Sequence, residues 1–127
     1  RWGVSAETPA ASPWELPADL RDFDLVLADV PCSNTGVFRR RPDALWHDRQ
    51  SDPALLALQR KILDAAAART ASGGNLIYST CSIDPAENEE QISRFLEDNP
   101  EFALQNSITL YPGKFHDGAF GALLVRR

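Results

Sequence analysis

The sequence predicts an α/β fold in which a mostly parallel sheet carries helices on its faces. Two short apolar runs, Phe23–Asp29 and Asn75–Thr80, have the composition of strands buried in a parallel sheet. A segment with one apolar face at helical spacing lies between them, and a second such segment follows. This alternation is typical of parallel strands joined by right-handed helical crossovers. The length of 127 residues is that of one domain.

The elements begin after a lead-in and are interrupted by one long loop. Residues 1–22 are rich in proline and small polar residues without a strand or helix period, so we expect an extended lead-in with no compact element. The first strand, Phe23–Asp29, is an apolar run closed by an acid, which favours burial on both faces. Residues 31–53 are rich in Pro, Arg, Asp and Ser and form a loop of the length that often carries function.

Two helices are predicted from their caps and their apolar faces. Asp52 and Pro53 supply a cap and a first-turn proline, and Gly73 and Gly74 end this helix. The second helix opens with a capping box at residues 84–87 and ends at residues 99–100. The expected apolar faces are Leu55, Leu58, Ile62 and Ala65/Ala66 in the first helix, and Ile92, Phe95 and Leu96 in the second.

The C-terminal part is expected to close the sheet. After Phe102–Leu104, the residues Pro112 and Gly113 indicate a turn. The apolar run Ala119–Val125 then has the composition of a final strand.

The composition is that of a soluble globular protein, with 43% apolar and 24% charged residues. We find neither an apolar run near the ~20 residues of a membrane span nor a signal-peptide pattern, and we expect a cytoplasmic protein without membrane contact. The net charge of −5 argues against non-specific coating of nucleic acid. The two cysteines are too few for a disulfide scaffold, and the two isolated histidines favour no metal site.

Both cysteines follow directly on predicted strands. Cys32 lies three residues after Asp29, and Cys81 comes immediately after Thr80. Neighbouring parallel strands lie about 4.8 Å apart, and ligands of such sheets bind beyond the carboxyl ends of the strands. We therefore expect both thiols to face one pocket. Two buried structural cysteines and a labile disulfide are the alternative interpretations.

The residues around the thiols favour chemistry. A carboxylate at the end of a buried strand, such as Asp29, needs a donor or a ligand. Pro31 stiffens the turn that presents Cys32, and the helix expected two residues after Cys81 would favour a thiolate through its positive end. A carboxylate, two thiols and a basic loop at one sheet edge indicate nucleophilic addition to an electron-poor substrate. The spacing leaves that substrate open.

Several segments of the chain resemble the signatures of the Sun-type RNA cytosine-5 methyltransferases. The resemblance extends over residues 23–127 and includes an Asp-Gly-aromatic pattern at Asp117–Phe120. It implies a Rossmann-like class I methyltransferase fold, the use of S-adenosylmethionine and, by analogy with bacterial members, ribosomal RNA as substrate. The segments are Asp29–Gly36 (DVPCSNTG), Arg39–Trp46 (RRRPDALW), Leu58-Gln59 and Tyr78–Glu89 (YSTCSIDPAENE).

The resemblance implies a role for each residue at the sheet edge. Cys81 would be the nucleophile that adds to C6 of cytosine, which allows C5 to attack the sulfonium methyl group. Cys32 would help to eliminate the enzyme and release the product. Asp29 would contact the methyl donor or the cytosine N3 edge, where it would offset the charge that thiolate attack creates.

The RNA contacts are expected on the loop beside the pocket. Arg39, Arg40 and Arg41 would hold phosphates of ribosomal RNA, or alternatively of transfer RNA. Trp46 stacks on a base or anchors its own loop. In the signature Tyr78–Glu89, we interpret Glu87 as the helix-capping residue and Asn88 as a partner that holds the Cys81 loop.

The family's donor-binding half has no counterpart in these residues. The seven glycines nowhere form G-x-G-x-x-G, and the proline-rich lead-in stands where a strand and glycine-rich turn belong. We therefore expect residues 23–127 to be the C-terminal half of the catalytic domain, truncated to strands four to seven and lacking the main S-adenosylmethionine loop. A catalytically inactive RNA-binding or interaction module, and an α/β domain with structural thiols, remain alternatives.

Half a sheet would also leave an exposed apolar edge at Phe23–Asp29. We expect self-association through this strand, or its covering by residues 1–20.

Overall fold

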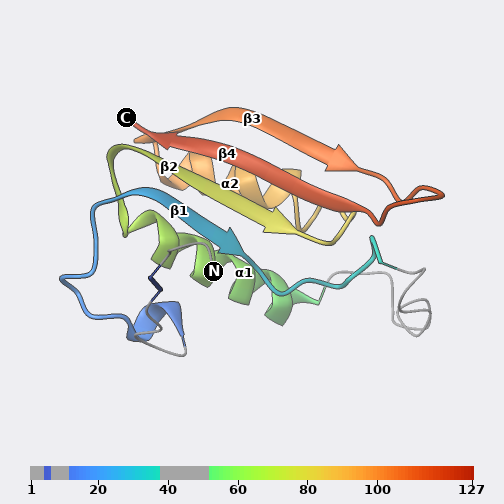
Figure 1. Ribbon diagram of the computed structural model, residues 1–127, viewed down its shortest axis with the longest axis horizontal. Coiled ribbons are helices and arrows are strands. Elements are labelled where there is room, and N and C mark those ends of the chain that lie inside the picture. The colour runs from blue at the N-terminus through green and yellow to red at the C-terminus, as the bar shows by residue number, and fades with distance from the viewer. Residues whose placement is uncertain (1–4, 7–11, 38–51) are drawn as a thin grey trace.

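The computed structural model describes residues 5–6, 12–37 and 52–127, and it confirms the α/β class (Figure 1). A sheet and two helices make up most of this part of the chain. The elements are η1 (Pro13–Glu15), β1 (Phe23–Asp29), α1 (Pro53–Ala67), β2 (Thr70–Thr80), α2 (Glu89–Asp98), β3 (Phe102–Leu110) and β4 (Ala119–Arg126).

The sheet is mixed within the described strands, where we expected it to be mostly parallel. Its order is β1-β2-β4-β3, with β1 parallel to β2 and with β4 antiparallel to both β2 and β3. The reason is the connection: β3 returns to β4 through residues 111–118, which contain no crossover helix, and a chain that reverses in this way pairs antiparallel. The parallel pair places the carboxyl ends of β1 and β2 at one edge, with Asp29 opposite Ser79.

Both helices cover the same face of the sheet, behind the strands as drawn in Figure 1. Leu76 and Tyr78 of β2 and Leu124 of β4 point to this side and are fully buried. They pack with Leu63 of α1 and Phe95 of α2 in one hydrophobic core. The described part of the molecule therefore has two layers, with the core between them.

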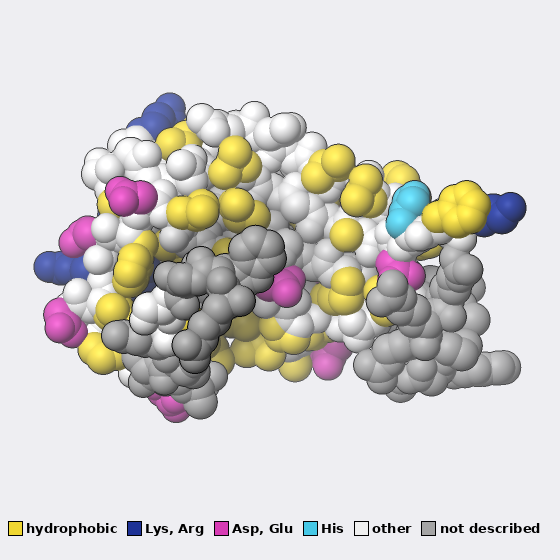
Figure 2. Space-filling view, in the orientation of Figure 1, with side chains coloured by type: hydrophobic (Ala, Val, Ile, Leu, Met, Phe, Trp, Pro, Cys, Tyr) yellow, Lys and Arg dark blue, Asp and Glu magenta, His cyan; other side chains and the backbone are white. Residues whose placement is uncertain are grey.

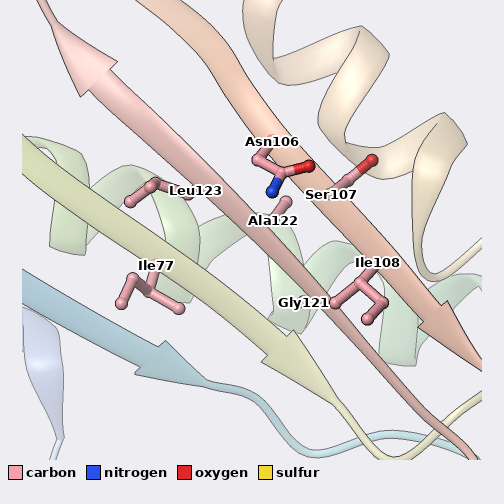
Figure 3. A pocket seen from close by; sticks show the side chains of 7 residues that line it. All are labelled: Ile77, Asn106, Ser107, Ile108, Gly121, Ala122 and Leu123. Atoms are coloured by element: carbon pink, nitrogen blue, oxygen red, sulfur yellow. The ribbon is translucent and has the colours of Figure 1, made fainter.

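The opposite face of the sheet carries exposed apolar side chains, so the expectation that β1 is buried on both faces is wrong. Leu25 is 60% exposed and Leu27 is 64% exposed. No described helix covers this face, and Figure 2 shows hydrophobic side chains spread across it. A shallow groove runs over it (Figure 3), lined by Ile77, Asn106, Ser107, Ile108, Gly121, Ala122 and Leu123.

The first helix ends earlier than its glycines predict. It stops at Ala67, and β2 begins at Thr70 and runs through Gly73 and Gly74. Gly73 takes a positive φ of 79°, and the pairing of β1 with β2 is irregular there, so these glycines shape a bulge. The helix face is also rotated from the expected one, since Leu58 is 36% exposed whereas Gln59 is fully buried.

Two further boundaries differ from the prediction. The strand β3 extends to Leu110, beyond the predicted Phe102–Leu104. The sequence does not show this length, because residues 105–107 are polar and lie exposed on an outer strand, where they interrupt the apolar pattern. The helix α2 begins at Glu89, since residues 85–88 form a separate turn. Its apolar stripe is as expected, with Ile92 and Phe95 buried.

The lead-in contains the 3-10 turn η1, which we did not expect. The guanidinium of Arg69 donates hydrogen bonds to the carbonyls of Leu16, Pro17 and Leu20, and Lys61 lies 3.9 Å from the centre of the Trp14 ring. Residues 12–22 are therefore fastened to the end of α1 and the residues after it. Among the described strands, β1 lies at the edge of the sheet and pairs only with β2.

Candidate active site

The two cysteines meet where β1 and β2 end. Cys32 lies in the turn after β1, Cys81 follows β2 directly, and their sulfur atoms are 3.0 Å apart. Both are free thiols and both are half-buried. The prediction that the two strand ends bring the thiols together is confirmed.

The turn after β1 is pinned to the Cys81 loop through its backbone. The amide of Gly36 donates to the carbonyl of Cys81 at 3.0 Å, and the amide of Gly118 donates to the carbonyl of Gly36 at 2.7 Å. A Cβ atom on Gly36 would lie 2.6 Å from the Cys81 carbonyl oxygen, which is too close for any side chain. Glycine at position 36 is therefore required for the two loops to approach each other.

Asn34 borders both thiols. Its backbone has a positive φ of 61°, which turns the side chain toward the sulfur atoms. The amide oxygen accepts a hydrogen bond from the Cys81 thiol at 2.9 Å and lies 3.9 Å from the Cys32 sulfur. We did not predict this contact, although Asn is one of the few residues that tolerate this backbone conformation.

The Cys32 thiol keeps its proton at neutral pH. Burial raises the pKa of Cys32 to about 12, and its hydrogen bond with Cys81 acts in the same direction. A thiol that stays protonated at 3.0 Å can donate a hydrogen bond to its neighbour. Cys32 is therefore suited to the role of proton donor.

Buried polar side chains lie behind the thiols. Asn88 is fully buried, accepts from the Thr80 hydroxyl at 2.7 Å and donates to the Ser82 carbonyl at 2.9 Å. It thus holds the residues on either side of Cys81, and the prediction that Asn88 holds the Cys81 loop is confirmed.

Glu87 is not the helix cap that we expected. It lies in the turn before α2, is fully buried, and accepts from the amide of Ser33 at 3.0 Å and from the Ser82 hydroxyl at 3.1 Å. The amide of Asp84, which a capping box would pair with Glu87, donates instead to the Ser82 hydroxyl at 3.0 Å. The spacing of a capping box is present, but the donors around Glu87 come from elsewhere in the fold.

The helix end expected to favour a Cys81 thiolate is also displaced. The helix α2 begins at Glu89, and a bend and a turn separate it from Cys81. Because the effect of a helix end falls off within its first turn, it does not account for reactivity at Cys81.

Asp29 lies at the expected strand end but in a different environment. Its side chain is exposed, since β1 has one uncovered face, and it accepts a hydrogen bond from the Ser79 hydroxyl at 2.8 Å. The expectation that it ends a buried strand is wrong. Its contact with cytosine or a methyl donor stays a prediction.

The remaining site predictions concern residues outside the described part of the chain. Arg39, Arg40 and Arg41, which we expected to bind RNA, and Trp46 all fall there. Across residues 5–6, 12–37 and 52–127, no group of three or more His, Cys, Asp or Glu side chains could hold a metal ion. Within the same ranges no helix is long and apolar enough to cross a membrane.

Known proteins are similar to this chain in sequence and in fold. A family described as 16S rRNA methyltransferase RsmB/F matches residues 7–121. The ribosomal RNA small subunit methyltransferase B of Salmonella paratyphi B is 45% identical in an alignment of 116 residues that covers 84% of this chain and 27% of that protein. The chain thus spans about a quarter of the length of the curated relatives it matches.

Solved structures agree with this similarity. A structure of NSun6 from Pyrococcus horikoshii with SFG matches with a TM-score of 0.71 and 28% identity. The match covers 87% of this chain and 33% of the NSun6 chain. A methyltransferase homologue from the same organism has a TM-score of 0.65 and 27% identity, covering 84% of this chain and 40% of its own. TrmN from Thermus thermophilus, with a TM-score of 0.54 and 21% identity over 92% of this chain and 27% of that chain, shares the fold.

Proposed function

Because the chain belongs to the RsmB/F family of 16S rRNA methyltransferases, we propose that the gene product containing it methylates C5 of a cytosine in ribosomal RNA. The methyl donor is S-adenosylmethionine, and the reaction passes through a covalent adduct between the cytosine and Cys81. The observation that carries the proposal is the pair of free thiols 3.0 Å apart at the carboxyl ends of two parallel strands.

The first step needs a nucleophile at C6. The Cys81 thiolate adds to C6, and the electron pair of the C5–C6 π bond moves to C5. C5 would then bond to the methyl group as the sulfonium–methyl bond breaks, and S-adenosylhomocysteine would leave as a neutral thioether. A hydrogen bond or proton at N3 offsets the negative charge that develops on the ring. Asp29, which is exposed at the end of β1, is the residue we assign to the N3 edge or to the donor.

The second step removes Cys81 from the methylated base. A general base takes the proton from C5, and the C5–C6 double bond re-forms. The C6–S bond breaks, and its electron pair stays on the Cys81 sulfur. Burial raises the pKa of Cys32, so this thiol holds a proton beside the leaving sulfur. A hydrogen bond from Cys32 stabilises the departing thiolate, which favours release of the product.

The target base has to leave its stack to reach this edge, which costs a few kcal/mol. We assign the neighbouring phosphates to Arg39, Arg40 and Arg41 on the loop between β1 and α1. Transfer RNA is the alternative substrate.

S-adenosylmethionine supplies an electrophilic methyl group on a sulfonium. Its use is supported by the related NSun6 structure, which was solved with SFG, an analogue of this donor. The chain fits the donor only in part: Asp29 offers an exposed carboxylate at the sheet edge, but the sequence holds no G-x-G-x-x-G turn. We assign the remaining donor contacts to parts of the gene product other than these residues.

This division favours a second candidate for the chain in isolation, an inactive RNA-binding module. Isothermal titration with S-adenosylmethionine distinguishes the two. Binding by the chain alone would count against the inactive module, and no binding would agree with it.

The proposed function is tested by analysis of the modified nucleoside. The complete gene product is incubated with small-subunit ribosomal RNA and methyl-labelled S-adenosylmethionine, and the RNA is digested and analysed by mass spectrometry. We expect 5-methylcytidine, and none with Cys81→Ala. A methyl group on an exocyclic amine or a ribose would contradict the proposed chemistry.

A further inference from the structure

The residues that follow the two cysteines are bound to the same carboxylate. The amide of Ser33, next to Cys32, donates to Oε2 of Glu87 at 3.0 Å. The hydroxyl of Ser82, next to Cys81, donates to Oε1 of Glu87 at 3.1 Å. Glu87 therefore bridges the two loops that carry the thiols.

Gln59 extends the bridge to the other side of Cys32. Its amide nitrogen donates to Oε2 of Glu87 at 2.9 Å and to the carbonyl of Pro31 at 3.0 Å. The peptide groups before and after Cys32 are thus held by Gln59 and Glu87 respectively. The helix α1 supplies Gln59 from its buried face, so the position of Cys32 is tied to a rigid element.

The bridge is buried and firmly anchored. Glu87 and Gln59 are both 0% exposed. The backbone carbonyl of Glu87 also accepts from the buried hydroxyl of Tyr78 at 2.7 Å, which fixes the turn to β2. A buried carboxylate is costly unless donors surround it, and this one accepts from an amide N–H, a hydroxyl and a side-chain amide.

We propose that Glu87, with Gln59, is a positioning residue that sets the spacing of Cys32 and Cys81. Asn88 already holds the residues on both sides of Cys81, so the loss of Glu87 frees mainly the Cys32 loop. The importance of this spacing for methyl transfer rests on the proposed function. The spacing itself is a property of the described chain and is measured without RNA or donor.

The test is the rate at which the two thiols form a disulfide with oxidised glutathione under native conditions. One thiolate attacks glutathione disulfide and releases one glutathione; the second thiolate displaces the other glutathione from the mixed disulfide. The protein loses two electrons, the oxidant gains them, and the two thiol protons end on the two released glutathione molecules. The second step is intramolecular, so its rate reports how closely the two sulfur atoms are held.

We expect Glu87→Ala to slow the second step by about tenfold or more, so that the mixed disulfide accumulates, because effective concentration depends steeply on geometry. Glu87→Gln should restore most of the rate. Its amide oxygen can accept from the Ser33 amide, and its amide nitrogen can donate to the Ser82 hydroxyl.

The matched control is Gln91→Ala. Gln91 is also buried and donates to the Leu56 carbonyl at 2.9 Å, which ties α2 to α1 away from the thiols. This variant should lose stability in urea without a change in the rate of disulfide formation. A Glu87→Ala variant that closes the disulfide as fast as the unmodified chain would overturn the proposal.

Gln59→Ala keeps the experiment decisive if Glu87→Ala does not fold. It leaves the carboxylate in place but releases the Pro31 carbonyl, and we expect a smaller slowing of the same step. An unchanged rate there would equally contradict the proposal. In the complete gene product, Glu87→Ala should lower kcat for methyl transfer and leave KM for RNA unchanged.

Discussion

Two regions of the sheet differ in how far the described chain supplies their contacts. One is the edge where β1 and β2 end, and the other is the open face that no described helix covers. At the edge, the fully buried Glu87 and Asn88 find their hydrogen-bond partners within the described chain. On the open face, Leu25 and Leu27 lie exposed beside a shallow apolar groove. The described residues alone therefore hold the two thiols in place, but they leave the apolar open face of the sheet uncovered.

The largest difference is expected between the two faces of the sheet. Leu76→Ala, on the helix-covered face, should lower the free energy of unfolding by about 2–5 kcal/mol, because Leu76 is fully buried. Leu27→Ala, on the open face, should cost about 0.5 kcal/mol or less. Urea unfolding followed by circular dichroism measures both, and equal costs would mean that the open face is covered in solution.

A smaller loss is expected for the network behind the thiols. Asn88→Ala leaves the Thr80 hydroxyl and the Ser82 carbonyl without these partners, and should cost about 1–3 kcal/mol. Asn106→Ala is the matched control, since Asn106 is exposed beside the groove. If the two substitutions cost the same, the network does not stabilise the site.

The pH dependence of Cys32 comes next. Because its pKa is raised to about 12, alkylation of Cys32 by iodoacetamide should stay slow through pH 9, whereas an unfolded peptide reaches its inflection near the ordinary value of about 8.5. The folded state binds this proton more tightly than the unfolded state. The contribution of Cys32 to the free energy of unfolding is therefore fully present below about pH 8.5 and is lost as the pH rises toward the folded pKa. Peptide mapping by mass spectrometry measures the rates, and an inflection near pH 8.5 at Cys32 would contradict its role as the protonated thiol of the pair.

The smallest expected effect is on self-association, which we propose occurs through β1. Leu27→Lys should shift the sedimentation of the chain toward the monomer, because a charge opposes pairing at an apolar edge. Ala57→Lys on the exposed surface of α1 is the control. A monomer at every concentration of the unmodified chain would contradict this proposal.

The two thiols lie together where their positions in the sequence predict. Cys32 and Cys81 each follow an apolar run, and parallel pairing brings such positions together. The role of Asn88 is predicted from its place in the signature Tyr78–Glu89, which the resemblance to the Sun-type methyltransferases identifies. These predictions depend on local order along the chain, which the sequence displays directly.

The failures have a common physical cause. The apolarity of Phe23–Asp29 was read as burial on both faces, but which faces are covered depends on elements elsewhere. Glu87 has the spacing of a capping box, yet its donors Ser33 and Gln59 come from distant parts of the chain. Both outcomes depend on contacts with residues distant in the sequence, and no local sequence pattern indicates those contacts.

The most direct test of the thiol pair uses ribosomal RNA that carries 5-fluorocytosine. The fluorine blocks loss of a proton from C5, so the adduct with the enzyme is trapped and can be mapped by mass spectrometry after digestion. With the complete gene product and S-adenosylmethionine, we expect the base on Cys81, an adduct that Cys81→Ala abolishes and Cys32→Ala retains. An adduct that survives Cys81→Ala and disappears with Cys32→Ala would reverse the two roles and contradict the account.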